Sequence, residues 1–242
     1  MEDSSYMVAD LEPFFPRIRA LLPDTRGHGR SQKFDRVEDY TYDRKLEDLL
    51  LWLDHLGIEN AVWGGASMGA AISLWAAVHA PQRVRAVISV SGPPYAAIEP
   101  DKAWWRAHRP LVEAGRFEEY YDANVRLRMG EATLARVKAR PERYAALTAP
   151  LRQHPVASLL ALLDETYSRP EWVAECARIR CPVQVIAGEV DHFPTAEMSR
   201  RVAQTIPGAR LHVVAGGSHF PNRSHRVEVQ GVIAAFFDEI GV

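Results

Sequence analysis

The sequence has few of the residues that mark a secreted or zinc-binding protein. Only two cysteines occur in 242 residues, Cys176 and Cys181, and no histidines cluster around them. Such a pair fits neither a zinc site nor a disulfide-dense secreted scaffold. We therefore expect a reducing, cytoplasmic setting for this protein.

Long apolar runs are also absent. The longest runs, such as residues 49–53, fall far short of the roughly 20 residues that a membrane span needs. The first five residues are acidic and polar, whereas a signal peptide begins with basic residues. The sequence therefore predicts a protein that is neither embedded in a membrane nor exported.

No excess of one charge is present, because 29 Lys and Arg residues nearly balance 31 Asp and Glu residues, for a net charge of −2. This balance does not attract nucleic acid or an anionic membrane, so we expect neither as a partner. The 47% of hydrophobic and 25% of charged residues are typical of a globular protein with a substantial core. The length suits one α/β domain with an inserted subdomain.

Strand and helix patterns alternate along the first part of the chain. The pattern predicts three strands and two helices, with strands at residues 17–22, 60–64 and 83–90 and helices at residues 37–56 and 68–79. Parallel neighbours need crossover connections, so the alternation predicts an α/β fold with a mostly parallel sheet flanked by helices.

The pattern changes in the middle of the chain. Residues 95–178 show helical periodicity without a convincing strand, interrupted by Pro110, Pro141, Pro150, Pro155 and Pro170. We interpret this segment as an inserted helical cap, and residues 1–94 and 179–242 as the core. Two strands (182–187 and 209–215) and two helices (195–204 and 225–240) are predicted after it.

The sharpest local signal is G-x-S-x-G at residues 65–69, between a predicted strand and a predicted helix. A serine on such a tight turn projects its Oγ outward, and the flanking glycines let the backbone turn without Cβ clashes. The backbone N–H of the following Met68 is placed to stabilise a developing oxyanion. The motif predicts Ser67 as a nucleophile; an ordinary strand-to-helix turn with an exposed serine is the alternative.

Two other glycine patterns do not support a nucleotide cofactor. Residues 64–69 have the glycine spacing of a phosphate loop, but Ala70 and Ala71 follow in place of Lys and Ser/Thr. Residues 27–29 begin a dinucleotide pattern, yet Gln32 stands where its third glycine belongs. We expect no cofactor and no metal.

A serine nucleophile needs a general base and a group that orients the base. His219 lies in a loop just after the last predicted strand, where a side chain reaches over neighbouring strand ends. Asp191 lies just past the preceding strand, with Glu189 as its nearby rival. The alternatives are that His219 is an ordinary loop or capping histidine and that the acid candidate is a solvated loop carboxylate.

The order Ser67, Asp191, His219, together with D-x-R-G-x-G-x-S at residues 24–31, resembles the α/β-hydrolase superfamily. The likeness is to its capped, ester-cleaving branch, which includes enol-lactonases, perhydrolases and carbon–carbon-bond hydrolases. It implies Ser67 as nucleophile, Asp191 as acid, His219 as base and the Met68 amide as an oxyanion donor.

The implied reaction is hydrolysis of a small carboxylic ester or lactone through an acyl-enzyme. A serine nucleophile argues against the dehalogenase and epoxide-hydrolase branches, which need a carboxylate. Carbon–carbon-bond hydrolysis or perhydrolysis on the same fold is an alternative. A non-catalytic ligand-binding or truncated, inactive member of the family is another.

The sequence departs from the family at its front. In the family, three strands and an H-G loop that gives the second oxyanion amide precede the first helix, whereas residues 4–15 already resemble that helix. We therefore expect about five parallel strands where the family has eight. The expectation is either a start codon placed downstream of the true one or a reduced family member.

Aromatic and arginine residues of the predicted cap allow a pocket as well as ordinary packing. Its aromatic residues include Trp104, Trp105, Tyr120, Tyr121 and Trp172. Packing between helices is the favoured interpretation for most of them. Its arginines, among them Arg106, Arg109, Arg126 and Arg128, are expected to form a solvated face more readily than a clamp for a substrate carboxylate.

Overall fold

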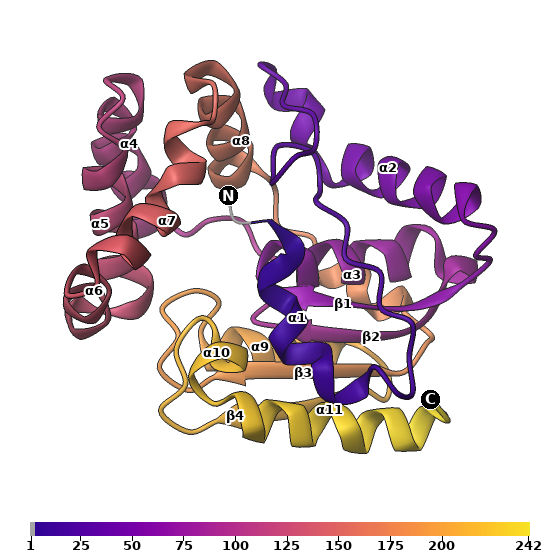
Figure 1. The fold of residues 1–242 in the computed structure, drawn as a ribbon. Helices are drawn as coiled ribbons and strands as arrows, with labels where there is room; N and C mark the ends of the chain where they lie inside the picture. Colours follow the sequence, from indigo (N-terminus) through magenta and orange to yellow (C-terminus); the bar gives the residue numbers. More distant parts are fainter. Residues whose placement is uncertain (1–2) are drawn as a thin grey trace. The chain divides into compact units, whose positions relative to one another are not determined.

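In the part of the chain that the structure describes, four parallel strands form the sheet, and their order in the sheet is their order in the sequence. The computed structural model describes residues 3–242. The strands are β1 (Ala61–Ala66), β2 (Val84–Val90), β3 (Val183–Gly188) and β4 (Arg210–Val214) (Figure 1). Within the described residues, β1 has a strand neighbour on one side only. The predicted α/β architecture with a parallel, helix-flanked sheet is confirmed.

The chain forms two compact units. The core unit comprises residues 6–22, 46–95 and 171–242 and holds the whole sheet. The helical unit comprises residues 23–45 and 96–170, together with the described residues up to Ser5. The predicted division into a core of residues 1–94 and 179–242 and a cap of residues 95–178 stays a prediction.

Helices cover both faces of the sheet in the core unit. Helices α3 (Met68–His79) and α9 (Ala196–Thr205) lie on one face, and α1 (Val8–Leu11) and α11 (Arg226–Ile240) lie on the other (Figure 1). Side chains alternate along a strand, so Ile88 and Val90 of β2 join a buried cluster with Phe236 and Phe237 of α11. All six residues of β3 are buried, as a parallel strand covered on both faces requires.

The remaining short elements of the core unit connect these layers. They are η1 (Ser4–Met7, which enters from the helical unit), η2 (Glu12–Phe14), η4 (Pro81–Arg83), η5 (Val173–Arg178) and α10 (Pro221–Ser224). No helix within residues 3–242 combines the length and the apolar character needed to cross a membrane.

Within the described residues, the helical unit holds five whole helices, one whole 3₁₀ turn and the first residues of α2 (Tyr42–His55). The whole elements are η3 (Val37–Tyr40), α4 (Glu99–Glu113), α5 (Phe117–Met129), α6 (Glu131–Lys138), α7 (Pro141–Arg152) and α8 (Val156–Ser168). Trp105, Tyr120 and Tyr167 belong to its buried cluster, and the Trp105 ring stacks on Tyr167 at 5.4 Å. Arg109 pairs with Glu113 and Asp164. Helix packing, the favoured interpretation of these aromatics, agrees with this arrangement.

Residues 17–22 are not a strand, and the expectation of about five strands was wrong, since the described residues contain four. The backbone N–H groups of Arg17 and Ile18 donate to the carbonyl of Phe14, so the segment begins inside a turn. An extended segment becomes a strand only when a neighbour pairs with its N–H and C=O groups, and here it pairs with none of the four strands.

Two predicted helices are interrupted. The helix over residues 4–15 divides into η1, α1 and η2, and α1 ends before Pro13, which has no N–H to continue its α-helical ladder. The helix over residues 37–56 divides into η3 and α2 (Tyr42–His55), since Thr41 between them is extended. Conversely, Pro110 and Pro150 lie inside α4 and α7, where breaks were predicted.

Candidate active site

Ser67 lies at the turn between β1 and α3. Its backbone has φ 53° and ψ −114°, a conformation that non-glycine residues rarely adopt and that is strained. A Cβ added to Gly65 would lie 2.7 Å from the carbonyl carbon of Gly69. The turn therefore requires glycine at position 65. In the same turn, the Ser67 N–H donates a hydrogen bond to the carbonyl of Val90 in β2 at 2.8 Å.

His219 faces Ser67 although the two residues are 152 positions apart in the chain. Its Nε2 lies 3.0 Å from the Ser67 Oγ, within the distance of about 3.5 Å expected for a base and its nucleophile. Its Nδ1 lies 3.0 Å from Oδ2 of Asp191. His219 is 5% exposed and Asp191 6%, so the bond between them is shielded from water, whereas the bond to the half-buried Ser67 is partly open to it. The three predicted residues thus form one hydrogen-bonded chain.

The orientation of Asp191 is fixed by its own loop. The carboxylate follows β3, and its Oδ1 accepts the backbone N–H of Phe193 at 3.1 Å. Glu189, the rival acid, is exposed and accepts the N–H of Gly216 at 2.9 Å instead. Asp191 therefore lies beside His219, whereas Glu189 bonds to the loop that follows β4.

Met68 is the first residue of α3. The first N–H groups of an α-helix have no acceptor within the helix, and the helix dipole places partial positive charge at the same end. The Met68 amide therefore stands next to Ser67 at a helix end suited to a negative oxygen. Its role as an oxyanion donor stays a prediction.

Gly188, which the sequence reading did not single out, positions the loop that carries His219. A Cβ added to this last residue of β3 would lie 2.2 Å from the carbonyl oxygen of Ser218 and 2.4 Å from that of Gly217. The N–H of Val190 also donates to the Gly217 carbonyl at 2.9 Å. Only glycine lets the loops after β3 and β4 approach this closely. A glycine at the very end of a buried strand was the available signal.

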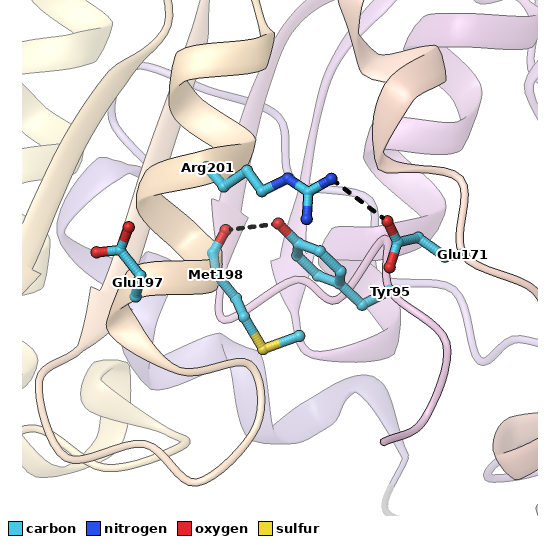
Figure 2. A pocket seen from close by; sticks show the side chains of 5 residues that line it. All are labelled: Tyr95, Glu171, Glu197, Met198 and Arg201. Carbon is cyan, nitrogen blue, oxygen red and sulfur yellow. Dashed lines mark hydrogen bonds and ion pairs between the residues drawn. The ribbon is translucent and has the colours of Figure 1, made fainter. Parts of the chain in front are cut away.

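A separate surface pocket of the core unit, about 290 Å³ in volume, is lined by Tyr95, Glu171, Glu197, Met198 and Arg201. Figure 2 shows Arg201 turned toward Glu171 and the Tyr95 hydroxyl toward Met198, while the Glu197 carboxylate points away. The Tyr95 hydroxyl donates to the Met198 carbonyl at 3.1 Å, and Arg201 lies 3.7 Å from Glu171. Its lining includes none of Ser67, Asp191 and His219.

The sequence was also compared with protein families and with known proteins. The family model described as "alpha/beta hydrolase fold" matches residues 3–225. The 3-oxoadipate enol-lactonase 2 of Acinetobacter baylyi is 32% identical over 213 residues, covering 86% of this chain and 74% of that protein. The 2-hydroxymuconate semialdehyde hydrolase of Pseudomonas putida is 27% identical over 231 residues, covering 91% and 77%.

A solved structure shares the fold. The enol-lactonase from Burkholderia xenovorans superposes with a TM-score of 0.83 at 22% identity, covering 98% of this chain and 87% of that chain. The resemblance expected from the elbow and the order of Ser67, Asp191 and His219 is confirmed at the level of the family. The chain belongs to the α/β-hydrolase family.

Proposed function

We propose that this protein is a serine hydrolase that cleaves a small carboxylic ester or lactone through an acyl-enzyme intermediate. The observation that carries the proposal is the hydrogen-bonded chain from Ser67 through His219 to Asp191. The likeness to an enol-lactonase over 86% of the chain supports the ester or lactone class.

In the first half of the reaction, the Ser67 Oγ attacks the carbonyl carbon while its proton passes to Nε2 of His219. The carbonyl electron pair moves to the oxygen, which becomes an oxyanion and accepts the Met68 N–H. The C–O bond to the leaving alcohol then breaks as His219 returns the proton to it. One donor of this kind contributes about 10²- to 10³-fold to turnover.

In the second half, water attacks the acyl carbon and gives a proton to His219. The second tetrahedral intermediate collapses, the bond to the Ser67 Oγ breaks, and the serine recovers its proton from His219. An ester yields an acid and an alcohol. A lactone yields one hydroxy acid, because its leaving alcohol remains attached to the acyl group.

Asp191 accepts the Nδ1–H of His219 throughout this cycle. The bond fixes the tautomer that leaves Nε2 free to take the serine proton, and the carboxylate stabilises the imidazolium that forms. Every step is performed by side chains and backbone of the chain itself, so the proposed reaction requires no cofactor.

The two cysteines are free thiols, and a cytoplasmic location stays a prediction.

The same residues suit two related reactions. A carbon–carbon-bond hydrolase would expel a carbon leaving group, and the 2-hydroxymuconate semialdehyde hydrolase likeness over 91% of the chain keeps this alternative open. A perhydrolase would use hydrogen peroxide in place of water on the acyl-enzyme. A ligand-binding member without turnover is the alternative from another class.

Labelling with a fluorophosphonate, combined with turnover of short-chain p-nitrophenyl esters and lactones, tests the proposal. Wild type should be labelled and should turn over. The Ser67→Ala variant should lose labelling and at least about 10³-fold of its turnover. The matched control is Ser168→Ala, at the exposed end of α8, which should keep both. Unlabelled but folded wild-type protein would favour the ligand-binding alternative.

A further inference from the structure

One buried carboxylate ties the segment that follows His219 to the N-terminal helix. Asp10 of α1 is 3% exposed. Its Oδ2 accepts Nδ2–H of Asn222 at 2.6 Å, and its Oδ1 accepts Nε–H of Arg226 at 2.9 Å. Asn222 lies in α10, shortly after His219, and Arg226 begins α11. Asp10 therefore holds two consecutive helices at the point where the chain leaves His219.

The Asn222 amide is oriented by Asp10. A carboxylate only accepts hydrogen bonds, so the amide must turn its NH₂ group toward Asp10. Its buried Oδ1 then finds no donor in the described part of the chain. A buried acceptor without a donor is unfavourable, and the amide keeps this orientation nonetheless. The bond to Asp10 thus decides where Asn222 lies.

An aromatic contact links the same two segments beside the His219 ring. The rings of His219 and Phe220 meet edge to face at 4.6 Å. The Arg223 guanidinium lies 4.8 Å from the centre of the Phe220 ring and 4.5 Å from that of Tyr6. Tyr6 therefore contacts Arg223 and Asp10 contacts Asn222, four and three residues after His219. A shift of the N-terminal helix would be passed to the imidazole through these contacts.

We propose that Asp10 is a positioning residue for His219 and acts through Asn222. Hydrogen bonds to Ser67 and Asp191 orient the imidazole ring, and the backbone behind the ring must be held as firmly for both bonds to form together. The bond from Asn222 to Asp10 supplies that anchor. This inference rests on the proposed function, because it assigns His219 the role of base.

Kinetics of Asp10→Ala and Asn222→Leu test the inference. Both variants should lose about 10- to 100-fold in kcat with little change in KM, since a shift of about 1 Å in a reacting group has this effect. The matched control is Gln230→Ala. Gln230 of α11 donates to the carbonyls of Ala9 and Asp10 and so bonds to the same helix through its backbone and not through the Asp10 carboxylate. It should keep kcat within about twofold.

A reciprocal exchange separates positioning from general stability. Asn222→Asp puts two carboxylates together, which can only accept hydrogen bonds, so this single variant should be slow. The double variant Asp10→Asn/Asn222→Asp restores an amide–carboxylate bond in the reverse direction and should recover most of kcat. The inference would be overturned if the single variants had a lowered Tm but the same kcat as the Gln230→Ala control.

Crystal structures give a readout that does not depend on turnover. In Asp10→Ala, or in Asn222→Leu if the first does not fold, the distance from Nε2 of His219 to the Ser67 Oγ should exceed 3.5 Å, the limit of a hydrogen bond. An unchanged distance of 3.0 Å would refute the inference. Failure of the proposed function would show differently, as wild-type protein with the intact bond and no fluorophosphonate labelling.

Discussion

The Lys45 ammonium lies 3.7 Å from the Glu165 carboxylate inside the helical unit, where the two side chains are 0% and 6% exposed. Arg169 approaches the same carboxylate at 3.0 Å and also donates to the Tyr42 hydroxyl. One buried carboxylate is thus shared by two cations. Burial lowers the pKa of Lys45 to about 8, and the attraction of Glu165 only partly opposes this effect.

The first prediction is that stability rises with pH between about 8 and about 10.5 through Lys45. The pKa of Lys45 is lower in the folded state than its ordinary value of 10.5, so the unfolded chain binds more protons in this range. Urea unfolding of wild type and Lys45→Met, at about pH 7 and about pH 9.5, measures the effect. Between the lower and the higher pH, the free energy of unfolding of the wild type should increase relative to that of the variant. Parallel pH profiles would contradict the prediction.

The second prediction concerns Gly188→Ala. The new Cβ meets the carbonyl oxygens of Gly217 and Ser218, so the loop that carries His219 must move, and kcat should fall by about 10²-fold. Gly231→Ala is the control, because that exposed glycine of α11 has open space around its Cβ position. The control should keep its activity and gain up to about 1 kcal/mol of stability. Equal activity of the two variants would show that the loop tolerates the displacement.

The third prediction distinguishes the two acids. Asp191→Asn keeps the shape of the side chain but no longer fixes the tautomer of His219, and kcat should fall by about 10⁴-fold. Glu189→Gln retains an oxygen that can accept the Gly216 N–H, so its kcat should change far less. A larger loss in Glu189→Gln than in Asp191→Asn would transfer the role of the acid to Glu189.

The fourth prediction uses the positive φ of Ser67. Ser67→Gly and Ser67→Ala both remove the hydroxyl, but only glycine adopts this backbone conformation without strain of about 1–3 kcal/mol. At ordinary positions glycine is less favourable than alanine by about 0.4–1 kcal/mol through the unfolded state. Urea unfolding should therefore find Ser67→Gly the more stable variant. A more stable Ser67→Ala would mean that the turn is not strained.

Local patterns predicted local structure well. The helix over residues 68–79 has the bounds of α3, because an apolar helix that follows a tight glycine-flanked turn is visible in the sequence. Residues 17–22 have the composition of a strand, but pairing depends on a neighbour that no local pattern contains. Asp10 and Asn222 are 212 residues apart, so only the folded chain brings them together. The roles of Ser67, His219 and Asp191 stay predictions until they are measured.

The pairing of Val87 in β2 with Val183 in β3 determines the order in which the sheet can be completed. The strands on either side of this pair are separated by the whole run of helices α4 to α8, and such distant contacts form slowly because a long loop must close first. During synthesis, β1 and β2 emerge before their next neighbour exists, and the N–H and C=O groups along that edge of β2 stay unpaired until β3 has left the ribosome. This edge is therefore open to pairing with another chain while the helical residues are being made.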